Sequence, residues 1–330
     1  MKKFVLFLLI AVTAVMLTGC GGNSKPANPL IVDDKTTAKP ATDAAKDKKQ
    51  IALVMKTLTN PFFIEMETGA RKAEKEFNIN LIVKAGAKET SIDQQISIVE
   101  ELIRAKTDAI VIAPGSSTEL IPVLARAQQA GIKIVNIDNR LDPALSQQAG
   151  LINVPFISVD NVKGAYQSAK YISDRITTPT AVAVLEGIRT AKNAEDRKTG
   201  ALQAFSENSN ITVVATETAN WKIDEAYDVT KAIYNRHPNI GAWFCANDMM
   251  ALGTIKYLAD TGKTGIPVAG YDALAEARKV IGEGKMAVTI DQQADVQGYT
   301  GVSYALKLIN GQSVPLETLV DVKLITQQRN

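Results

Sequence analysis

The 330-residue sequence has few of the residues that build metal sites and disulfide frameworks. It contains one histidine, His237, and two cysteines, Cys20 and Cys245. These counts exclude a disulfide-stapled fold and a histidine-rich metal site. Lysine and arginine number 37 against 35 aspartate and glutamate residues. With no basic excess to neutralise phosphates, we expect no nucleic-acid partner.

The first residues of the chain have the pattern of a secretory signal. Lys2 and Lys3 precede an apolar run of 14 residues from Phe4 to Leu17, interrupted only by Thr13. A membrane-spanning helix needs about 20 apolar residues, so this run is too short to cross comfortably. A basic start followed by a short apolar stretch predicts a signal peptide over residues 1–19.

The apolar run ends in a motif that resembles a bacterial lipobox, Leu17-Thr18-Gly19-Cys20. We therefore expect Cys20 to be lipidated, which makes the protein a membrane-anchored lipoprotein of the periplasm or another extracytoplasmic space. The alternative is a plain signal peptide in which the cysteine is accidental. Residues 20–49, apart from Cys20, are rich in Lys, Ala, Asp, Thr and Pro, a composition that predicts a flexible tether.

From Gln50 onward, apolar runs alternate with helical stretches. Ile51–Met55 is a continuous apolar run, and 62–77 has apolar residues at three-to-four spacing. Such alternation predicts right-handed βαβ units, and roughly 280 residues exceed the usual size of one core. We expect two similar doubly wound α/β lobes with a break near 158–161. Further strands are predicted at 79–83, 108–113, 132–137, 180–185, 211–216, 241–245, 266–270 and 287–290, and further helices at 91–104, 118–129, 194–206, 224–235 and 248–260.

Polar and aromatic residues follow the predicted strands, where open parallel sheets bind ligands. They show no Ser/His/Asp arrangement, metal cluster or cofactor loop, so we expect neither an enzyme nor a cofactor. Planar amides, carboxylates and an arginine suit sugar hydroxyls, and aromatic faces suit the C–H faces of a sugar ring. The residues that follow the strands include the site candidates Lys56, Asn60, Phe62, Phe63, Asp138, Asn139, Arg197, Trp221, Asn247, Asp272 and Gln292, alongside others such as Arg140, Glu195, Asp196 and Asp248.

Each of these residues also has a structural interpretation. Asp138 and Asp272 could cap turns, and Asn247 could cap the helix 248–260. Phe62 and Phe63 are adjacent on a helix, so one of them is expected in the core. Their joint placement at strand ends favours a shared site.

Two motifs resemble those of the ribose-type periplasmic sugar-binding proteins, over essentially residues 50–328. The chain opens its first domain as that family does, and a later stretch is similar to the family's second-domain signature. Lys56, the Ala113-Pro114 pair with the double serine, and Glu186-Gly187 are similar to the allose-binding members. The two motifs are Ile51-Ala52-Leu53-Val54 followed by Thr57-Leu58-x-Asn60-Pro61-Phe62-Phe63, and Cys245-Ala246-Asn247-Asp248-x-Met250-Ala251-Leu252-Gly253.

The resemblance implies two lobes joined by three crossing segments near 159–161, 291–293 and 321–322. The N-terminal lobe would comprise 50–159 plus 293–321, and the C-terminal lobe 160–292 plus 322–330. The resemblance also places the site candidates above in one sugar pocket between the lobes.

Several positions differ from the ribose type. Trp221 stands where phenylalanine is usual, Lys56 replaces a serine, Asn139 replaces an arginine, and the loop 141–156 is longer.

The implied function is that of the binding component of a sugar ABC transporter. It would be a monomer that closes by a hinge on a monosaccharide of the allose or ribose type, and a membrane permease would read the closed form. An alternative is a sugar or signal-molecule receptor that feeds a chemoreceptor or sensor kinase. A repressor with the same two lobes would need an N-terminal helix-turn-helix, where this chain has a signal and a tether.

Overall fold

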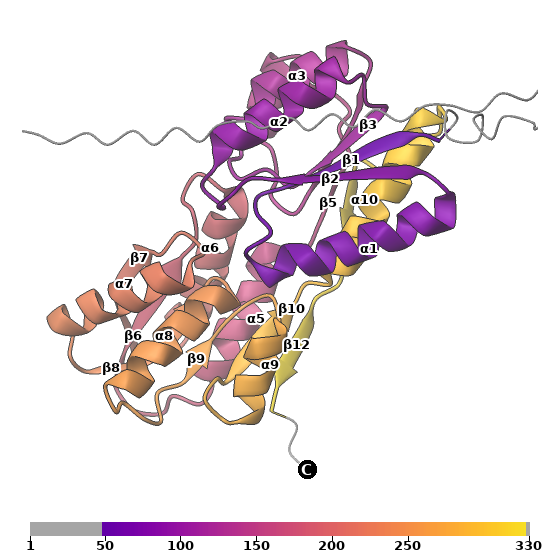
Figure 1. Ribbon diagram of the computed structural model, residues 1–330. Helices are drawn as coiled ribbons and strands as arrows, with labels where there is room; N and C mark the ends of the chain where they lie inside the picture. The colour runs from indigo at the N-terminus through magenta and orange to yellow at the C-terminus, as the bar shows by residue number, and fades with distance from the viewer. Residues whose placement is uncertain (1–47, 328–330) are drawn as a thin grey trace, which may run out of the picture. The chain divides into compact units, whose positions relative to one another are not determined.

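Two six-stranded sheets form the framework of the computed structural model, which describes residues 48–327. The predicted signal peptide, the lipidation at Cys20 and most of the tether lie outside the described residues. Figure 1 shows the path of the chain from β1 to β12.

The first sheet has the strand order β2-β1-β3-β4-β5-β11, and every neighbouring pair is parallel. The strand order reverses between β1 and β3, and α/β sheets open a crevice at the carboxyl ends of their strands at such a switch point. The strands are β1 (Gln50–Met55), β2 (Asn80–Ala85), β3 (Ala109–Ile112), β4 (Lys133–Ile137), β5 (Phe156–Ser158) and β11 (Glu317–Leu319).

The second sheet repeats this plan in the order β7-β6-β8-β9-β10-β12. Its switch point lies between β6 and β8, and only the edge strand β12 runs antiparallel to its neighbour β10. The strands are β6 (Thr180–Glu186), β7 (Ile211–Thr218), β8 (Ile240–Cys245), β9 (Val268–Ala269), β10 (Val288–Asp291) and β12 (Lys323–Thr326).

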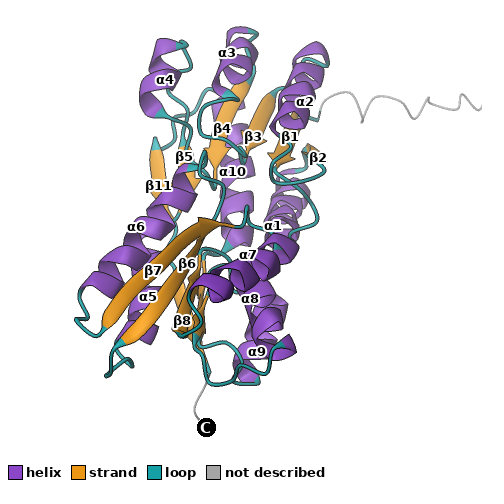
Figure 2. Cartoon of the chain, turned by 90° about the vertical axis from the view of Figure 1, so that its left-hand side faces the viewer, coloured by secondary structure: helices purple, strands orange, loops and turns teal. Residues whose placement is uncertain are grey.

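Helices cover both faces of each sheet, which explains why the central strands are apolar on both sides. All five residues from Ile51 to Met55 are fully buried. The pair α1 and α10 packs together in the first lobe, as Figure 1 shows, and the pair α5 and α6 packs together in the second, as Figure 2 shows. The helices are α1 (Pro61–Phe77), α2 (Ile92–Arg104), α3 (Ile121–Gln129), α4 (Pro143–Gln148), α5 (Asn161–Ser173), α6 (Lys192–Ser206), α7 (Ile223–Arg236), α8 (Asp248–Asp260), α9 (Ala275–Gly282) and α10 (Ala294–Ile309).

The chain crosses between the two sheets three times. It leaves the first sheet after β5, returns after β10 to form α10, and leaves again between β11 and β12. The three crossing segments are 159–160, 292–293 and 320–322. The first lobe is hereafter the sheet containing β1 with its helices α1–α4 and α10, and the second lobe is the sheet containing β6 with α5–α9.

The predicted fold class, two doubly wound α/β lobes, is confirmed. Several elements carried too little signal to be predicted, because β5, β11 and α4 are only three to six residues long. The predicted strand at 266–270 shrinks to Val268–Ala269, and the helix predicted from 118 begins at Ile121. Residues 115–120 form a loop instead, and this loop contacts the second lobe.

The contact between α1 and α10 leaves no room for side chains at two glycines. A Cβ on Gly69 would lie 1.8 Å from the carbonyl oxygen of Asp295, and a Cβ on Gly298 would lie 2.1 Å from that of Met66. The backbones of the two helices therefore meet directly, and this contact fixes the returning helix to the first lobe.

We predict that Gly298→Ala lowers the free energy of unfolding by about 1–3 kcal/mol, because the added methyl group overpacks this contact. Gly282→Ala is the matched control, since its Cβ meets nothing within 4 Å. It should leave stability unchanged or raise it by up to about 1 kcal/mol. Urea unfolding of both variants measures the difference, and equal midpoints would contradict the packing argument.

Candidate functional site

The carboxyl ends of the two sheets meet around one small cavity of about 20 Å³, room for about one water molecule. Side chains from both lobes line it, and they include every residue predicted for the site except Asn139. Two further residues, Glu89 and Asn193, were not predicted. The lining residues are Lys56, Asn60, Phe62, Phe63, Glu89, Asp138, Asn193, Arg197, Trp221, Asn247, Asp272 and Gln292.

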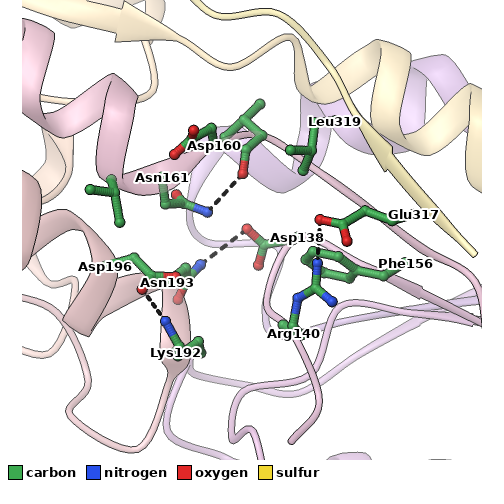
Figure 3. A pocket seen from close by; sticks show the side chains of 12 residues that line it. Asp138, Arg140, Phe156, Asp160, Asn161, Lys192, Asn193, Asp196, Glu317 and Leu319 are labelled. Atoms are coloured by element: carbon green, nitrogen blue, oxygen red, sulfur yellow. Dashed lines mark hydrogen bonds and ion pairs between the residues drawn. The ribbon is translucent and has the colours of Figure 1, made fainter. Parts of the chain in front are cut away.

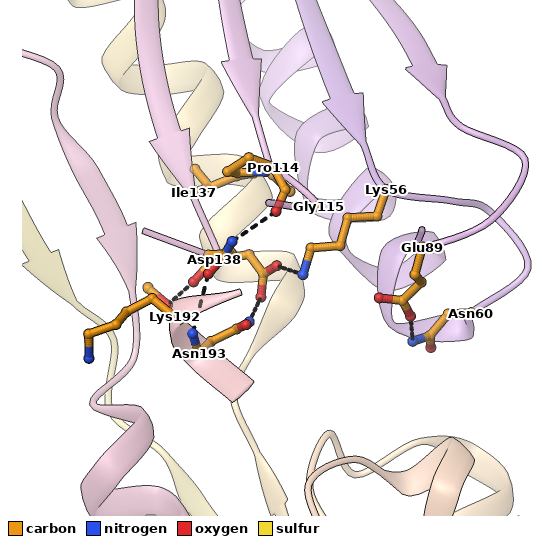
Figure 4. A network of polar contacts seen from close by, with 12 residues as sticks. Lys56, Asn60, Glu89, Pro114, Gly115, Ile137, Asp138, Lys192 and Asn193 are labelled. Atoms are coloured by element: carbon orange, nitrogen blue, oxygen red, sulfur yellow. Dashed lines mark hydrogen bonds and ion pairs between the residues drawn. The ribbon is translucent and has the colours of Figure 1, made fainter. Parts of the chain in front are cut away.

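A buried ion pair joins the ends of β1 and β4. Lys56 Nζ lies 2.7 Å from Asp138 Oδ2, and the two side chains are 3% and 2% exposed (Figure 4). The ammonium group also lies 5.7 Å from the centre of the Phe63 ring and 5.9 Å from that of Trp221. A lysine can only donate, so the pair presents donors and acceptors side by side at the cavity wall.

Arg197, in the second turn of α6, is the centre of a polar cluster in the second lobe. Its Nη1 donates to the carbonyl oxygen of Ala246 at 2.9 Å and to Asp272 Oδ1 at 3.4 Å. Its Nη2 donates to Gln292 Oε1 at 3.3 Å, and Nε donates to Asn161 Oδ1 at 2.8 Å. These bonds hold a guanidinium group that is 3% exposed in a fixed orientation.

Asp272 completes this cluster. Its Oδ1 accepts from Gln292 Nε2 at 2.6 Å. Burial raises the pKa of Asp272 well above its usual value, and the Arg197 guanidinium opposes this rise. The residue has φ of 120°, so the turn after β9 holds it in a conformation that costs free energy.

Asp248 bonds to the turn that carries Asp272. Its Oδ2 accepts from the backbone N–H of Leu274 at 2.9 Å, and its Oδ1 accepts from the Thr289 hydroxyl at 2.7 Å. Burial raises the pKa of Asp248 to about 7, although these hydrogen bonds lower it. Asp248 therefore positions the strained turn that presents Asp272 to the cavity.

Strained backbone recurs at two other strand ends. Asp138 has φ of 63° and Trp221 has φ of 66°. Non-glycine residues rarely adopt this region, and such residues cluster at binding sites. With Asp272, three of the residues predicted from strand ends have this geometry.

Three aromatic rings line the cavity. Phe62 and Phe63 are 3% and 1% exposed, and their rings meet edge to face at a centroid distance of 5.1 Å. One of them was expected in the core; both belong to it, and both also line the cavity. Trp221 is 4% exposed, and its Nε1 has no hydrogen-bond partner.

Two asparagines each cap a helix and also line the cavity. Asn247 caps α8, since its Oδ1 accepts from the Met250 N–H at 2.9 Å, as the capping alternative predicted. Asn60 caps α1 in the same way through the Phe62 N–H at 3.1 Å. Both caps also line the cavity, so a helix N-terminus points toward it from each lobe.

Strand-end reasoning missed Glu89 and Asn193, although both lie in segments that follow a strand, β2 for Glu89 and β6 for Asn193. Glu89 lies in the loop before α2 and accepts from Asn60 Nδ2 at 2.8 Å. Burial raises the pKa of Glu89 to about 7, while the nearby Lys56 and the bond from Asn60 lower it. Asn193 Nδ2 donates to Asp138 Oδ1 at 3.3 Å, and its own Oδ1 has no partner.

Asn139 has a different place from the one expected. It is fully buried, and its Nδ2 donates to the carbonyl oxygen of Pro114 at 3.1 Å. Its Oδ1 accepts from the Ser117 hydroxyl and from the Asn193 backbone N–H, each at 3.3 Å. The amide is therefore committed to protein groups beside the cavity.

A larger pocket of about 220 Å³ adjoins the cavity on the side of the first crossing segment (Figure 3). Asp138 and Asn193 line both spaces, so their hydrogen bond stands between them. Two ion pairs, Arg140 with Glu317 and Lys192 with Asp196, lie at the pocket's wall.

Residues 48–327 contain no group of three His, Cys, Asp or Glu side chains placed to hold a metal ion. Within the same range, no helix is long and apolar enough to cross a membrane. Cys245 is buried in β8, and burial raises the pKa of its thiol to about 12. The cavity wall combines hydrogen-bond donors, acceptors and aromatic faces, a set that suits a small polyhydroxylated ring.

Comparisons with known proteins agree with this geometry. The model of a family described as periplasmic binding protein domain matches residues 51–313. The chain is 39% identical over 270 residues to the D-ribose/D-allose-binding protein of Pseudomonas aeruginosa, covering 81% of this chain and 84% of that protein. It is 34% identical over 279 residues to the D-allose-binding periplasmic protein of Escherichia coli, covering 84% and 90%.

A solved structure is similar to this chain in fold and in sequence. It is an ABC transporter periplasmic solute binding protein from Actinobacillus succinogenes with bound D-allose. The TM-score is 0.80 at 41% identity, with 85% of this chain and 98% of that chain covered.

We predict that Glu89→Gln changes how stability depends on pH. The folded pKa of about 7 lies above the ordinary 4.5, so the stability associated with Glu89 is present below pH 4.5 and is lost as pH rises through 7. The difference corresponds to about 3 kcal/mol. Relative to the native protein, the glutamine variant should gain up to that amount between pH 5 and pH 8, measured by urea unfolding. A gap that does not change with pH would show that Glu89 is not held in a desolvated site.

Proposed function

The chain belongs to the periplasmic binding protein domain family, and on that basis we propose that it is the sugar-binding component of an ABC importer, with a monosaccharide of the allose or ribose type as its ligand. Its named relatives are binding proteins, and the chain is not an enzyme. Their sugars are the first candidates for this cavity.

The observation that carries the proposal is the composition of the cavity wall. Planar polar groups of both lobes, among them Asp138, Asn193, Arg197 and Asp272, face one space together with three aromatic rings. A sugar hydroxyl both donates and accepts, and paired planar groups satisfy both capacities. A buried polar group left without its hydroxyl costs about 1–3 kcal/mol, which gives the site its selectivity.

Unpaired atoms indicate where a ligand would bond. Trp221 Nε1 is a buried donor and Asn193 Oδ1 a buried acceptor, and neither has a partner in the protein. We infer that ligand hydroxyls satisfy both atoms. The ring would then lie between the phenylalanines of α1 and the indole, with Arg197 and Asp272 at one edge and Lys56 and Asp138 at the other.

Entry of a ligand requires the lobes to separate. The cavity of about 20 Å³ is smaller than a monosaccharide ring, and its lining side chains are almost fully buried, so the lining must also move apart around a bound ring. Only three segments connect the lobes, so rotation about 159–160, 292–293 and 320–322 is the motion that opens the site. We propose that the ligand stabilises the closed form, which the permease recognises.

The proposed location is the extracytoplasmic side of a membrane. The sequence supports a lipid anchor at Cys20, followed by a tether to residue 49 that would leave the lobes free to reach a permease. Mass spectrometry of the native N-terminus tests the anchor. A diacylglycerol-modified Cys20 is expected, and an unmodified cysteine would contradict it.

We predict a selective response in a thermal-shift screen of pentoses, hexoses and polyols. D-allose or D-ribose at 100 times its Kd should add about 2.7 kcal/mol to stability, because the ligand binds the folded state alone. Related aldoses and cyclitols provide the comparison. A screen in which no monosaccharide raises the melting temperature would reject the proposed function.

Substitution in the polar cluster should abolish binding. We predict that Arg197→Ala weakens sugar affinity at least about thirtyfold, because it leaves Asp272 buried without its cation. Arg236→Ala is the matched control. It breaks an exposed pair between the last residue of α7 and Glu217 of β7, and it should leave affinity unchanged. Titration calorimetry on folded protein measures both. Equal affinities in the two variants would refute this site.

A further inference from the structure

The N-terminus of α6 has no cap from its own lobe. The residue at the cap position is Ala191, which has no side-chain oxygen to accept a hydrogen bond. The first backbone N–H groups of a helix have no partner within the helix, and side chains of Ser, Thr, Asp or Asn usually satisfy them. The N–H groups of Lys192 and Asn193 are therefore free to bond elsewhere.

The missing cap comes from the first lobe. The Ser117 hydroxyl oxygen accepts from the Lys192 N–H at 2.9 Å, and Asn139 Oδ1 accepts from the Asn193 N–H at 3.3 Å. A third bond runs the other way, from the Ser117 N–H to the carbonyl oxygen of Thr190 at 3.0 Å. Two successive helix donors and one carbonyl of the second lobe thus bond to two residues of the first.

These acceptors are held in place within the first lobe. The Ser117 hydroxyl donates to Asn139 Oδ1, and Asn139 Nδ2 donates to the carbonyl oxygen of Pro114. The loop before Ser117 is fixed by Gln95, which bonds the Ala113 carbonyl at 3.0 Å and the Gly115 N–H at 2.8 Å. These contacts lie within the first lobe and hold both acceptors in the orientation that meets α6.

We propose that Ser117 and Asn139 form an interlobe helix cap, a pair of positioning residues that stabilises the closed form and so sets ligand affinity without contacting the ligand. The proposal rests on the proposed function, since it assumes that closure accompanies binding. When the lobes separate, the N–H groups of Lys192 and Asn193 lose these partners and face water. When the lobes close, the cap holds α6 in the position from which Asn193 and Arg197 face the cavity.

The neighbouring serine offers a matched control. Ser116 is fully buried in the same loop, but its hydroxyl oxygen accepts only from Thr118 and Glu119 of its own lobe. Ser116→Ala and Ser117→Ala thus remove the same atom from adjacent positions, one inside a lobe and one between the lobes.

Ser117→Ala should raise the Kd for the sugar about fivefold relative to Ser116→Ala, the effect of one lost hydrogen bond. The change should lie in faster dissociation, because only the closed form contains the cap. Calorimetry gives the Kd and stopped-flow fluorescence the rates. A merely structural serine would instead lower the melting temperature of the ligand-free protein and leave the dissociation rate unchanged.

A second variant supplies the missing cap inside the second lobe. Ala191 has φ of −102° and ψ of 123°, a backbone conformation suited to a capping serine. Ala191→Ser should cap α6 in the open form as well, so the ligand-free protein should melt at a higher temperature while the sugar binds more weakly. If the substitution only impaired folding, the melting temperature and the sugar affinity would both fall.

Hydrogen exchange of the sugar-bound protein tests the cap directly, because only the closed form contains it. The amides of Lys192 and Asn193 should exchange faster in Ser117→Ala than in Ser116→Ala. Equal exchange at these amides together with equal affinities overturns the interlobe cap. If the native protein binds no sugar, the proposed function fails, whereas failure of the cap alone would leave the native protein binding its sugar and the two serine variants equal in affinity and in amide exchange.

Discussion

The burial of charge between two sheet ends is the constraint on which the site depends. Lys56, Asp138, Arg197 and Asp272 are each 5% exposed or less, and an isolated charge at such a place would cost several kcal/mol. Each is therefore paired, Lys56 with Asp138 and Arg197 with Asp272. Pairing fixes the orientation of every group, so the cavity presents a rigid pattern of donors and acceptors. A neutral polyol can replace water against such a pattern without bringing a charge of its own.

The two lobes contribute to this pattern differently. In the first lobe, Asn60 bonds Glu89, while Asn139 and the loop around Ser117 hold one another. In the second, Arg197 connects the turn at Asp272 with Gln292 at a crossing segment. Because Gln292 lies in the chain that joins the lobes, a ligand at the guanidinium is linked to the point about which the lobes would turn. The bond between Asn193 and Asp138 links the lobes at the opposite wall.

Much of the architecture follows from local patterns. The apolar run at Ile51–Met55 predicts a strand covered on both faces, and the alternation that follows predicts parallel sheets, because helices must return the chain to the same end. Strand ends in such sheets converge, which is why Asp138, Trp221 and Asp272 could be grouped from sequence. The short β5 and β11 could not be predicted, since three residues show no periodicity. The return of α10 to the first lobe depends on contacts with α1 more than 200 residues earlier, and it was expected only from the family resemblance.

The sequence by itself determined the alternating α/β plan and the residue types at the strand ends, because these depend on hydrophobic periodicity and on local spacing. The tertiary structure decided which groups are partners. Glu89 reaches the cavity from a loop, Asn139 turns from a predicted ligand contact to a protein contact, and Ser117 meets α6 across a sequence separation of 75 residues. Hydrogen bonding of this kind depends on distances of about 3 Å between atoms that only the packing of two lobes brings together. No local pattern contains that information.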